Sequence, residues 1–112
     1  MGTLVRFDDL KRNAHGPFFD RRELRAILEL YGERVSRGEW RDYAIDRQPG
    51  RVGFAVFRSS FDWPLYVIAK FRAGSSKQGD YAVFAGPRRV ACGRTIEDVL
   101  ERLRAELAPA GA

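Results

Sequence analysis

The chain has 112 residues, 45% of them hydrophobic, and a formal net charge of +5. This length fits one folded domain, and no apolar run is long enough to cross a membrane. A single cysteine excludes an internal disulfide and favours a reducing cytoplasm. Because His15 and Cys92 are the only residues of their kinds, a zinc site built from nitrogen and sulfur ligands is excluded. We expect neither a metal nor another cofactor.

The chain begins with a segment that has no sustained hydrophobic period. We therefore expect residues 1–18 to form a loosely ordered arm and residues 19–108 to form a single domain. Asp20 and Glu23 then have the spacing of a capping box, which predicts that a helix begins here. Gly38 is a natural left-handed stop for this helix. Its apolar residues fall on one stripe, which we expect to face the core: Leu24, Ile27, Leu28, Tyr31 and Val35.

From residue 41 onward the hydrophobic period changes to two, which indicates strands. We expect strands at residues 41–46, 52–57, 65–72 and 81–85, with a short fifth one at 90–92. Thr95 then caps a second helix with an apolar stripe like the first. Short links favour an antiparallel arrangement. The predicted fold is α+β, an antiparallel β-meander of four to five strands with an N-terminal and a C-terminal helix packed on one face.

The segment "GEWRDYAID", residues 38–46, concentrates carboxylates and aromatic rings. On a strand, Asp42 and Asp46 lie about 13 Å apart, too far for the carboxylate pair of a glycoside hydrolase. We expect them to pair with arginines on neighbouring strands, and Trp40 to pack back on the helix. The segment is therefore interpreted as a structural corner, with a recognition groove beside Trp40 and Arg41 as the alternative. No catalytic residue is identified, and we predict that the protein is not an enzyme.

Four segments carry a resemblance to a known family: "DRRELRAILELYGERVSRGEWRDYAID" (20–46), "VFRSSFDWPLYVI" (56–68), "QGDYAV" (78–83) and "GRTIEDVL" (93–100). Over about residues 19–104 the chain resembles the alphaproteobacterial family known as domain of unknown function 2794. The resemblance implies a short bacterial cytoplasmic protein with no established activity. It implies no catalytic residues for this chain.

The third expected strand suggests where a partner binds. If Leu65, Val67 and Phe71 face the helices, the even-numbered residues of this strand face outward. That open face would be partly apolar and partly basic, and such a surface is typical of an interaction site. We predict a protein-binding, adaptor or self-associating module, whose partner is another protein or a second copy. Its predicted contact residues are Phe57, Tyr66, Ile68, Arg58, Lys70 and Arg72.

Two alternatives remain open. In the first, the arm covers this face with Leu4, Val5 and Phe7. In the second, the basic strand region binds nucleic acid through phosphates without sequence preference. The order helix, antiparallel meander, helix is also that of double-stranded RNA-binding domains, which is an analogy of fold alone. The predicted nucleic-acid residues are Arg51, Arg58, Lys70, Arg72, Arg88 and Arg89.

Overall fold

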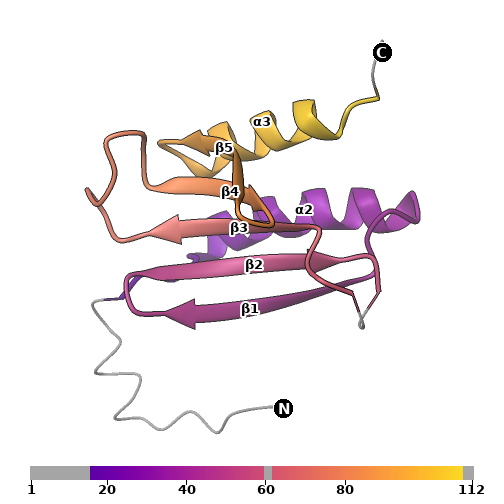
Figure 1. Ribbon diagram of the computed structural model, residues 1–112, viewed down its shortest axis with the longest axis horizontal. Helices are drawn as coiled ribbons and strands as arrows, with labels where there is room; N and C mark the ends of the chain where they lie inside the picture. The colour runs from indigo at the N-terminus through magenta and orange to yellow at the C-terminus, as the bar shows by residue number, and fades with distance from the viewer. Residues whose placement is uncertain (1–15, 60–61, 110–112) are drawn as a thin grey trace, which may run out of the picture.

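The computed structural model describes residues 16–59 and 62–109. The elements in chain order are α2 (Arg21–Ser36), β1 (Asp42–Gln48), β2 (Arg51–Phe57), β3 (Tyr66–Phe71), β4 (Tyr81–Ala85), β5 (Arg88–Gly93) and α3 (Ile96–Leu107). The strands form one antiparallel sheet in the order β1-β2-β3-β4-β5, and both helices lie behind it in Figure 1. The predicted α+β meander is confirmed, with five strands. Most of the predicted arm, and its suggested cover of the sheet, lies outside the described residues.

Helix α2 begins at the predicted capping box. The Asp20 carboxylate accepts the Glu23 N–H at 2.7 Å, and the Glu23 carboxylate accepts the Asp20 N–H at 2.9 Å. The first of these hydrogen bonds holds the pKa of Asp20 below its ordinary value. Gly38 follows the helix with a φ of 74°, the left-handed conformation that glycine adopts without strain. Both ends of α2 are thus set by local sequence.

The residues of α2 that are buried differ from the apolar residues predicted to face the core. Ile27 and Leu30 are fully buried, and Glu23 and Arg34 lie on the same line. Leu28, by contrast, is exposed, as is Val35. The apolar surface of α2 is therefore wider than the part of the helix that packs against the sheet. The prediction that the whole stripe faces the core is wrong for its outer half.

The faces of β3 are opposite to those predicted. Phe54 pairs with Ile68, and Ile68 pairs with Val83, and all three side chains are fully buried in the core. Tyr66 and Lys70 share the face of Ile68 because side chains alternate along a strand. Both faces of β3 are apolar, so its own alternation does not determine its orientation, and pairing with β2 decides it.

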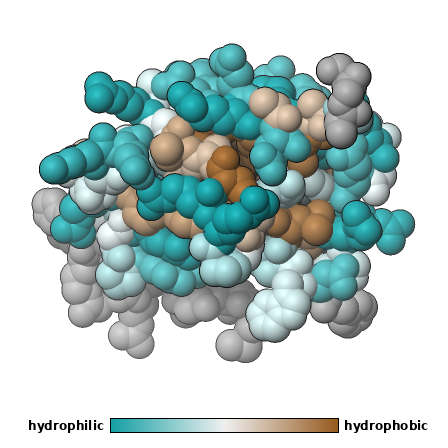
Figure 2. All heavy atoms as spheres, turned by 45° about the horizontal axis from the view of Figure 1, so that its top comes forward, coloured by the Kyte–Doolittle hydropathy of each residue, from teal (hydrophilic) through white to brown (hydrophobic). Residues whose placement is uncertain are grey.

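The open side of the sheet is covered by two of its own rings. Ala69 and Ala82 form a cross-strand pair there, and both are buried. Phe71 and Phe84 flank this pair diagonally on the same face, and their ring centroids are only 6.4 Å apart, so the rings lean over the alanines. Figure 2 views this side obliquely from the β5 edge and shows apolar side chains in its middle, bordered by hydrophilic ones.

The corner between α2 and β1 is structural at Trp40. Its side chain is buried, and its ring lies 6.2 Å from the ring of Tyr31 and 6.4 Å from that of Tyr66. Trp40 itself is therefore a core residue, while the alternative of a recognition groove beside Trp40 and Arg41 stays a prediction. The expected arginine pairs are wrong. Asp42 accepts the Tyr43 N–H at 2.8 Å and Asp46 accepts from the Gln48 amide at 2.9 Å, and neither forms a salt bridge with any described residue.

Helix α3 closes the other half of the core. Thr95 is its N-cap and accepts the Asp98 N–H at 3.1 Å. Its buried residues are Ile96, Val99, Leu100 and Leu103. The helix lies over β5 and β4 and contacts α2 on one flank, where Arg22 pairs with Glu97 and Glu33 pairs with Arg104. That flank of α2 is occupied, which leaves the opposite flank facing the β1 edge.

Candidate functional site: an apolar strip beside the edge strand

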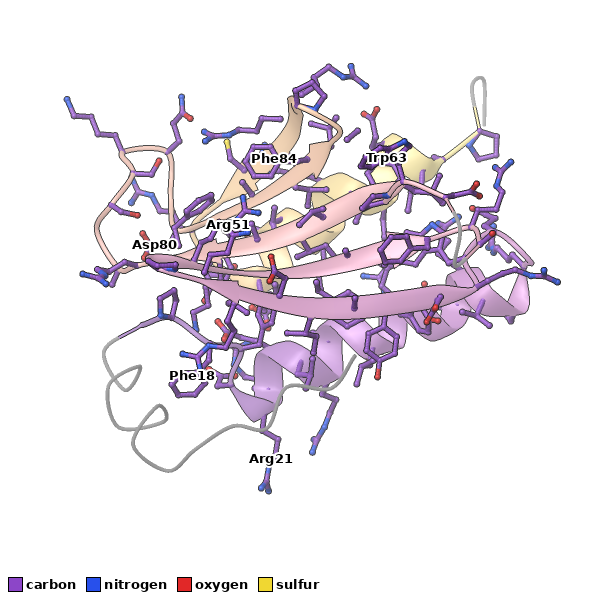
Figure 3. The ribbon with its side chains drawn as sticks, turned by 60° about the horizontal axis from the view of Figure 1, so that its bottom comes forward. Phe18, Arg21, Arg51, Trp63, Asp80 and Phe84 are labelled. Atoms are coloured by element: carbon purple, nitrogen blue, oxygen red, sulfur yellow. The ribbon has the colours of Figure 1, made fainter. Side chains whose placement is uncertain are left out.

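An exposed apolar surface joins α2 to the edge strand β1. We call it the α2–β1 strip, and it consists of Leu28, Tyr31, Val35, Tyr43 and Ile45. Six large hydrophobic side chains of the described residues are exposed, and four of them belong to this strip, with 38% to 47% of their surface accessible. The other two, Phe18 and Trp63, lie elsewhere, with Phe18 at the start of α2 and Trp63 on the open side of the sheet (Figure 3).

The strip is held rigidly by aromatic contacts. The Tyr31 ring meets the Tyr43 ring edge to face at a centroid distance of 5.0 Å, and Tyr43 stacks on Phe54 at 4.7 Å and 8°. Such pairs add about 0.5–1.5 kcal/mol each beyond area burial. Burial, with Asp42 and Tyr43 nearby, raises the pKa of Tyr31, so its hydroxyl stays neutral at physiological pH. The strip is therefore a preformed, uncharged surface.

The backbone of β1 is open along this strip. The Arg72 N–H donates to the Gly50 carbonyl at 3.0 Å. The even-numbered residues of β2 therefore form their backbone hydrogen bonds with β3, and the odd-numbered residues of β2 form theirs with β1. The register then directs the N–H and C=O groups of Asp42, Ala44, Asp46 and Gln48 toward β2. Ile45 consequently points its N–H and C=O away from the sheet. No strand of the described chain lies beyond β1.

A buried polar cluster ties the start of α2 to the sheet. The Glu23 carboxylate accepts from the Lys70 ammonium at 2.6 Å and from the Tyr81 hydroxyl, and Lys70 also donates to the Phe18 carbonyl at 2.9 Å. Burial, followed by the hydrogen bond to Glu23, raises the pKa of Tyr81. A hollow of about 480 Å³ lies beside Lys70 and Tyr81. These polar groups have partners within the fold, and the cluster thereby anchors the start of α2 to the sheet.

The predicted partner-binding residues do not share one surface. Ile68 is fully buried, Tyr66 lies against Trp40, and Lys70 is bound to Glu23, all on the helix side. Phe57 is on the open side, where it is partly buried, while Arg58 and Arg72 are exposed outside the strands. The expectation that Tyr66, Ile68 and Lys70 face outward is wrong, for the register reason given above.

Of the six predicted nucleic-acid residues, Arg58 and Arg72 are exposed outside the strands, and the other four divide into two groups. Lys70 pairs with Glu23, Arg88 lies 4.0 Å from Glu106, and neither belongs to a cluster of open cations. Arg51 and Arg89 instead stand on the open side with the two rings described above. The Arg89 guanidinium lies 5.6 Å from the centroid of the Phe84 ring, and Arg51 lies opposite Phe71 across the strand pair.

We call this second group the arginine–phenylalanine row: Arg51, Phe71, Phe84 and Arg89. Figure 3 shows Arg51 and Phe84 on the same side of the sheet, away from the helices. The Nε of Arg51 is buried and has no hydrogen-bond partner among the described residues, whereas Arg89 donates to the Gln78 amide oxygen at 2.6 Å. Aromatic rings interleaved with cations are a feature of surfaces that bind single-stranded nucleic acid.

The sequence pattern alone does not distinguish the residues of the α2–β1 strip from core residues. The sequence predicts Leu28, Tyr31 and Val35 as core residues, but Leu28 and Val35 are exposed, and so are Tyr43 and Ile45 on the helix side of β1. The sequence does contain one indication of this surface. With Leu30 included, the apolar residues of α2 cover a wider part of the helix surface than the single row of residues that is buried. Such a broad stripe can mark a helix that is covered on two sides.

The described residues define a small α+β protein whose edge strand and neighbouring helix share an apolar surface. They contain no group of three or more His, Cys, Asp or Glu side chains that could hold a metal ion. None of their helices is both long enough and apolar enough to span a bilayer.

The chain belongs to the family described as protein of unknown function (DUF2794), whose model matches residues 17–90. This range includes α2 and the whole strip, and it ends within β5, so "GRTIEDVL" lies outside it. Searches of the curated proteins and of the solved structures found no match.

Proposed function

We propose that this protein is a non-catalytic protein-binding module whose interface is the α2–β1 strip. The observation that carries the proposal is that, among residues 16–59 and 62–109, four of the six exposed large hydrophobic side chains gather on this one surface. Contiguous exposed apolar surface on a small protein is characteristic of interaction sites. Charged Arg47 borders it on β1, two residues from Ile45 on the same face, and a polar rim around an apolar centre is the usual anatomy of an interface.

The absence of a catalytic role is part of the proposal. The cluster of Glu23, Lys70 and Tyr81 brings titratable groups together, but each of these groups is hydrogen-bonded within the fold. A general base needs an accessible lone pair aimed at a substrate proton, and Glu23 is almost fully buried. A cytoplasmic location, supported by the single cysteine, and an alphaproteobacterial source remain expectations.

The experiment that tests the interface is a pair of matched variants. Leu28→Ser with Val35→Ser removes two strip side chains, and Trp63→Ser removes an exposed side chain outside the strip. The tagged protein is captured from native, nuclease-treated lysate of cells that also express the untagged chain, and retained proteins are identified by mass spectrometry. We expect the strip variant to lose its retained proteins and the Trp63 variant to keep them. Equal retention by both variants would overturn the proposal.

A second candidate function rests on the arginine–phenylalanine row. Its cations and rings on one open face favour nucleic-acid binding without sequence preference. This function predicts an affinity for single-stranded DNA or RNA that falls steeply between about 50 and about 200 mM salt. Arg51→Glu with Arg89→Glu would abolish it, whereas Arg21→Glu with Arg25→Glu, which makes the same charge change on α2, would weaken it far less. Absence of binding at the lower salt concentration would exclude this function.

A further inference from the structure

We infer that the occupant of the α2–β1 strip is a second copy of this chain, joined by antiparallel pairing of β1 with β1 about a two-fold axis at Ile45. This inference rests on the proposed function and names the partner. Edge strands that remain single are usually protected by charged side chains, above all lysine, by proline or by a bulge. The charged residues of β1 are Asp42, Asp46 and Arg47, and the register with the axis at Ile45 sets none of them opposite a like charge. The seven residues of β1 contain no proline and no lysine, and their pairing with β2 is regular throughout. The edge is therefore suited to receive another strand.

The two-fold axis fixes which residues meet. An axis perpendicular to the sheet keeps the helices of both copies on the same side and makes the interface self-complementary. Residues that lie opposite each other must then share a face, so odd-numbered residues meet odd-numbered ones. With the axis at Ile45, each Ile45 lies opposite the partner's Ile45, and Tyr43 lies opposite the partner's Arg47. All four side chains lie on the helix side of the joined sheet.

The open backbone groups fit this register. Ile45 directs its N–H and C=O toward the edge, as the alternation of hydrogen bonds in the sheet requires. Two copies of Ile45 can therefore exchange both hydrogen bonds across the axis. At one end of the strand, the Asp42 carboxylate accepts the Tyr43 N–H at 2.8 Å, so in a single copy this N–H group already has a partner. The pairing is thus centred on Ile45.

Charge selects this register over its neighbours. With the axis at Ile45, Asp42 lies opposite the partner's Gln48, and Asp46 lies opposite the partner's Ala44. If the axis moves to Ala44, Asp42 lies opposite the partner's Asp46. If it moves to Asp46, the two Asp46 carboxylates face each other. Like charges directly opposite in a sheet are destabilising, so both neighbouring registers are disfavoured.

The apolar strip continues across the axis. Both α2 helices lie on the same side of the joined sheet, and the flank that carries Leu28, Tyr31 and Val35 faces the β1 edge, because Tyr31 contacts Tyr43. The opposite flank of α2 is tied to α3 by Arg22–Glu97 and Glu33–Arg104. Pairing of the strands therefore brings the two exposed flanks toward each other and buries them. Apolar burial supplies the driving force that strand pairing alone lacks.

The test is a disulfide placed on the proposed axis. In a Cys92→Ser background, Ile45→Cys puts the two thiols on residues whose Cα atoms are about 5.5 Å apart in a hydrogen-bonded pair, within disulfide range. Asp42→Cys is the control, because its two copies are offset by six residues, or about 20 Å. Mild oxidation should give a crosslinked dimer with Ile45→Cys and none with Asp42→Cys. Equal crosslinking of both, or of neither, would overturn the register.

Sedimentation of the full chain separates this inference from the proposed function. The wild type should form dimers and Ile45→Glu should be monomeric with an unchanged circular dichroism spectrum. If the wild type is monomeric while the Leu28→Ser/Val35→Ser variant still loses its captured proteins, the inference that the partner is a second copy is refuted, and the proposed function stands. If Leu4→Ser, Val5→Ser and Phe7→Ser together convert a monomeric wild type into a dimer, the arm is the occupant and the inference is equally refuted.

Discussion

The ring of Tyr31 on α2 meets the ring of Tyr43 on β1 edge to face, with 5.0 Å between their centroids. This contact joins a helix and an edge strand into one apolar surface. Leu28 and Val35 extend the surface along α2, and Ile45 extends it along β1. Because the opposite flank of α2 is paired with α3, the helix cannot rotate to bury these side chains within one copy. Their exposure is a consequence of how α2 is anchored.

The first prediction concerns the buried line of α2. Leu30→Ala should lower the free energy of unfolding by about 2–5 kcal/mol because a fully buried leucine leaves a cavity. Leu28→Ala, two residues earlier and exposed, should cost under about 1 kcal/mol. Urea unfolding followed by circular dichroism measures both values, at a protein concentration low enough to keep the chain monomeric. Equal losses would show that α2 is rotated relative to the structure described above.

A second prediction contrasts two glycines. Gly32 lies in α2 with nothing within 4 Å of an added Cβ, so Gly32→Ala should raise the free energy of unfolding by about 0.5–1 kcal/mol. Gly79 has a φ of 112°, and a Cβ there would lie 2.1 Å from the Gly93 carbonyl oxygen. Gly79→Ala should therefore cost about 2 kcal/mol or more. Thermal unfolding of the two variants should shift in opposite directions, and a shared direction would contradict the account.

The third prediction concerns the buried carboxylate of Glu23. Glu23→Ala leaves Lys70 and Tyr81 without their shared acceptor and should cost about 3 kcal/mol. Adding Lys70→Met should recover part of that loss, because the unpaired ammonium is removed. Chemical unfolding of the two single variants and the double variant gives the coupling energy directly. If the two single losses simply add in the double variant, Glu23 and Lys70 do not act as a pair.

The fourth prediction concerns stability at high pH. Because burial raises the pKa of Tyr81 in the folded state, the folded chain binds this proton more tightly than the unfolded chain. The resulting stabilisation is complete below the ordinary tyrosine pKa of about 10 and is lost as the pH rises above it. Between about pH 9 and about pH 11, the wild type should lose more unfolding free energy than Tyr81→Phe. Equal losses in the two proteins would contradict the assignment.

Local signals in the sequence predicted most of the fold. Asp20, Glu23, Gly38 and Thr95 each act within three or four residues of their own position, so their roles can be inferred without tertiary structure. The period-two segments and short links likewise gave the antiparallel meander. By contrast, the face of Ile68 depends on pairing with Phe54. Both faces of β3 are apolar, and no local pattern distinguishes them.

The candidate site could not be predicted for a related reason. Leu28 and Val35 have the spacing of core residues on a helix, and only the docking angle of α2 leaves them outside. Lys70 was expected on an open surface because its partner, Glu23, is 47 residues away in the chain. The exposed strip thus results from the long-range placement of α2 against the sheet. It becomes visible only when burial is known residue by residue.

The most direct test of the central claim is the amide exchange rate of Ile45, measured by NMR at several protein concentrations. In a single copy its N–H points away from the sheet, whereas in the paired state it donates to the partner's Ile45 carbonyl. The Ala44 N–H bonds β2 in both states and serves as the internal reference. We expect Ile45 exchange to slow relative to Ala44 as concentration rises. An Ile45 exchange rate that is independent of concentration would contradict pairing through this edge.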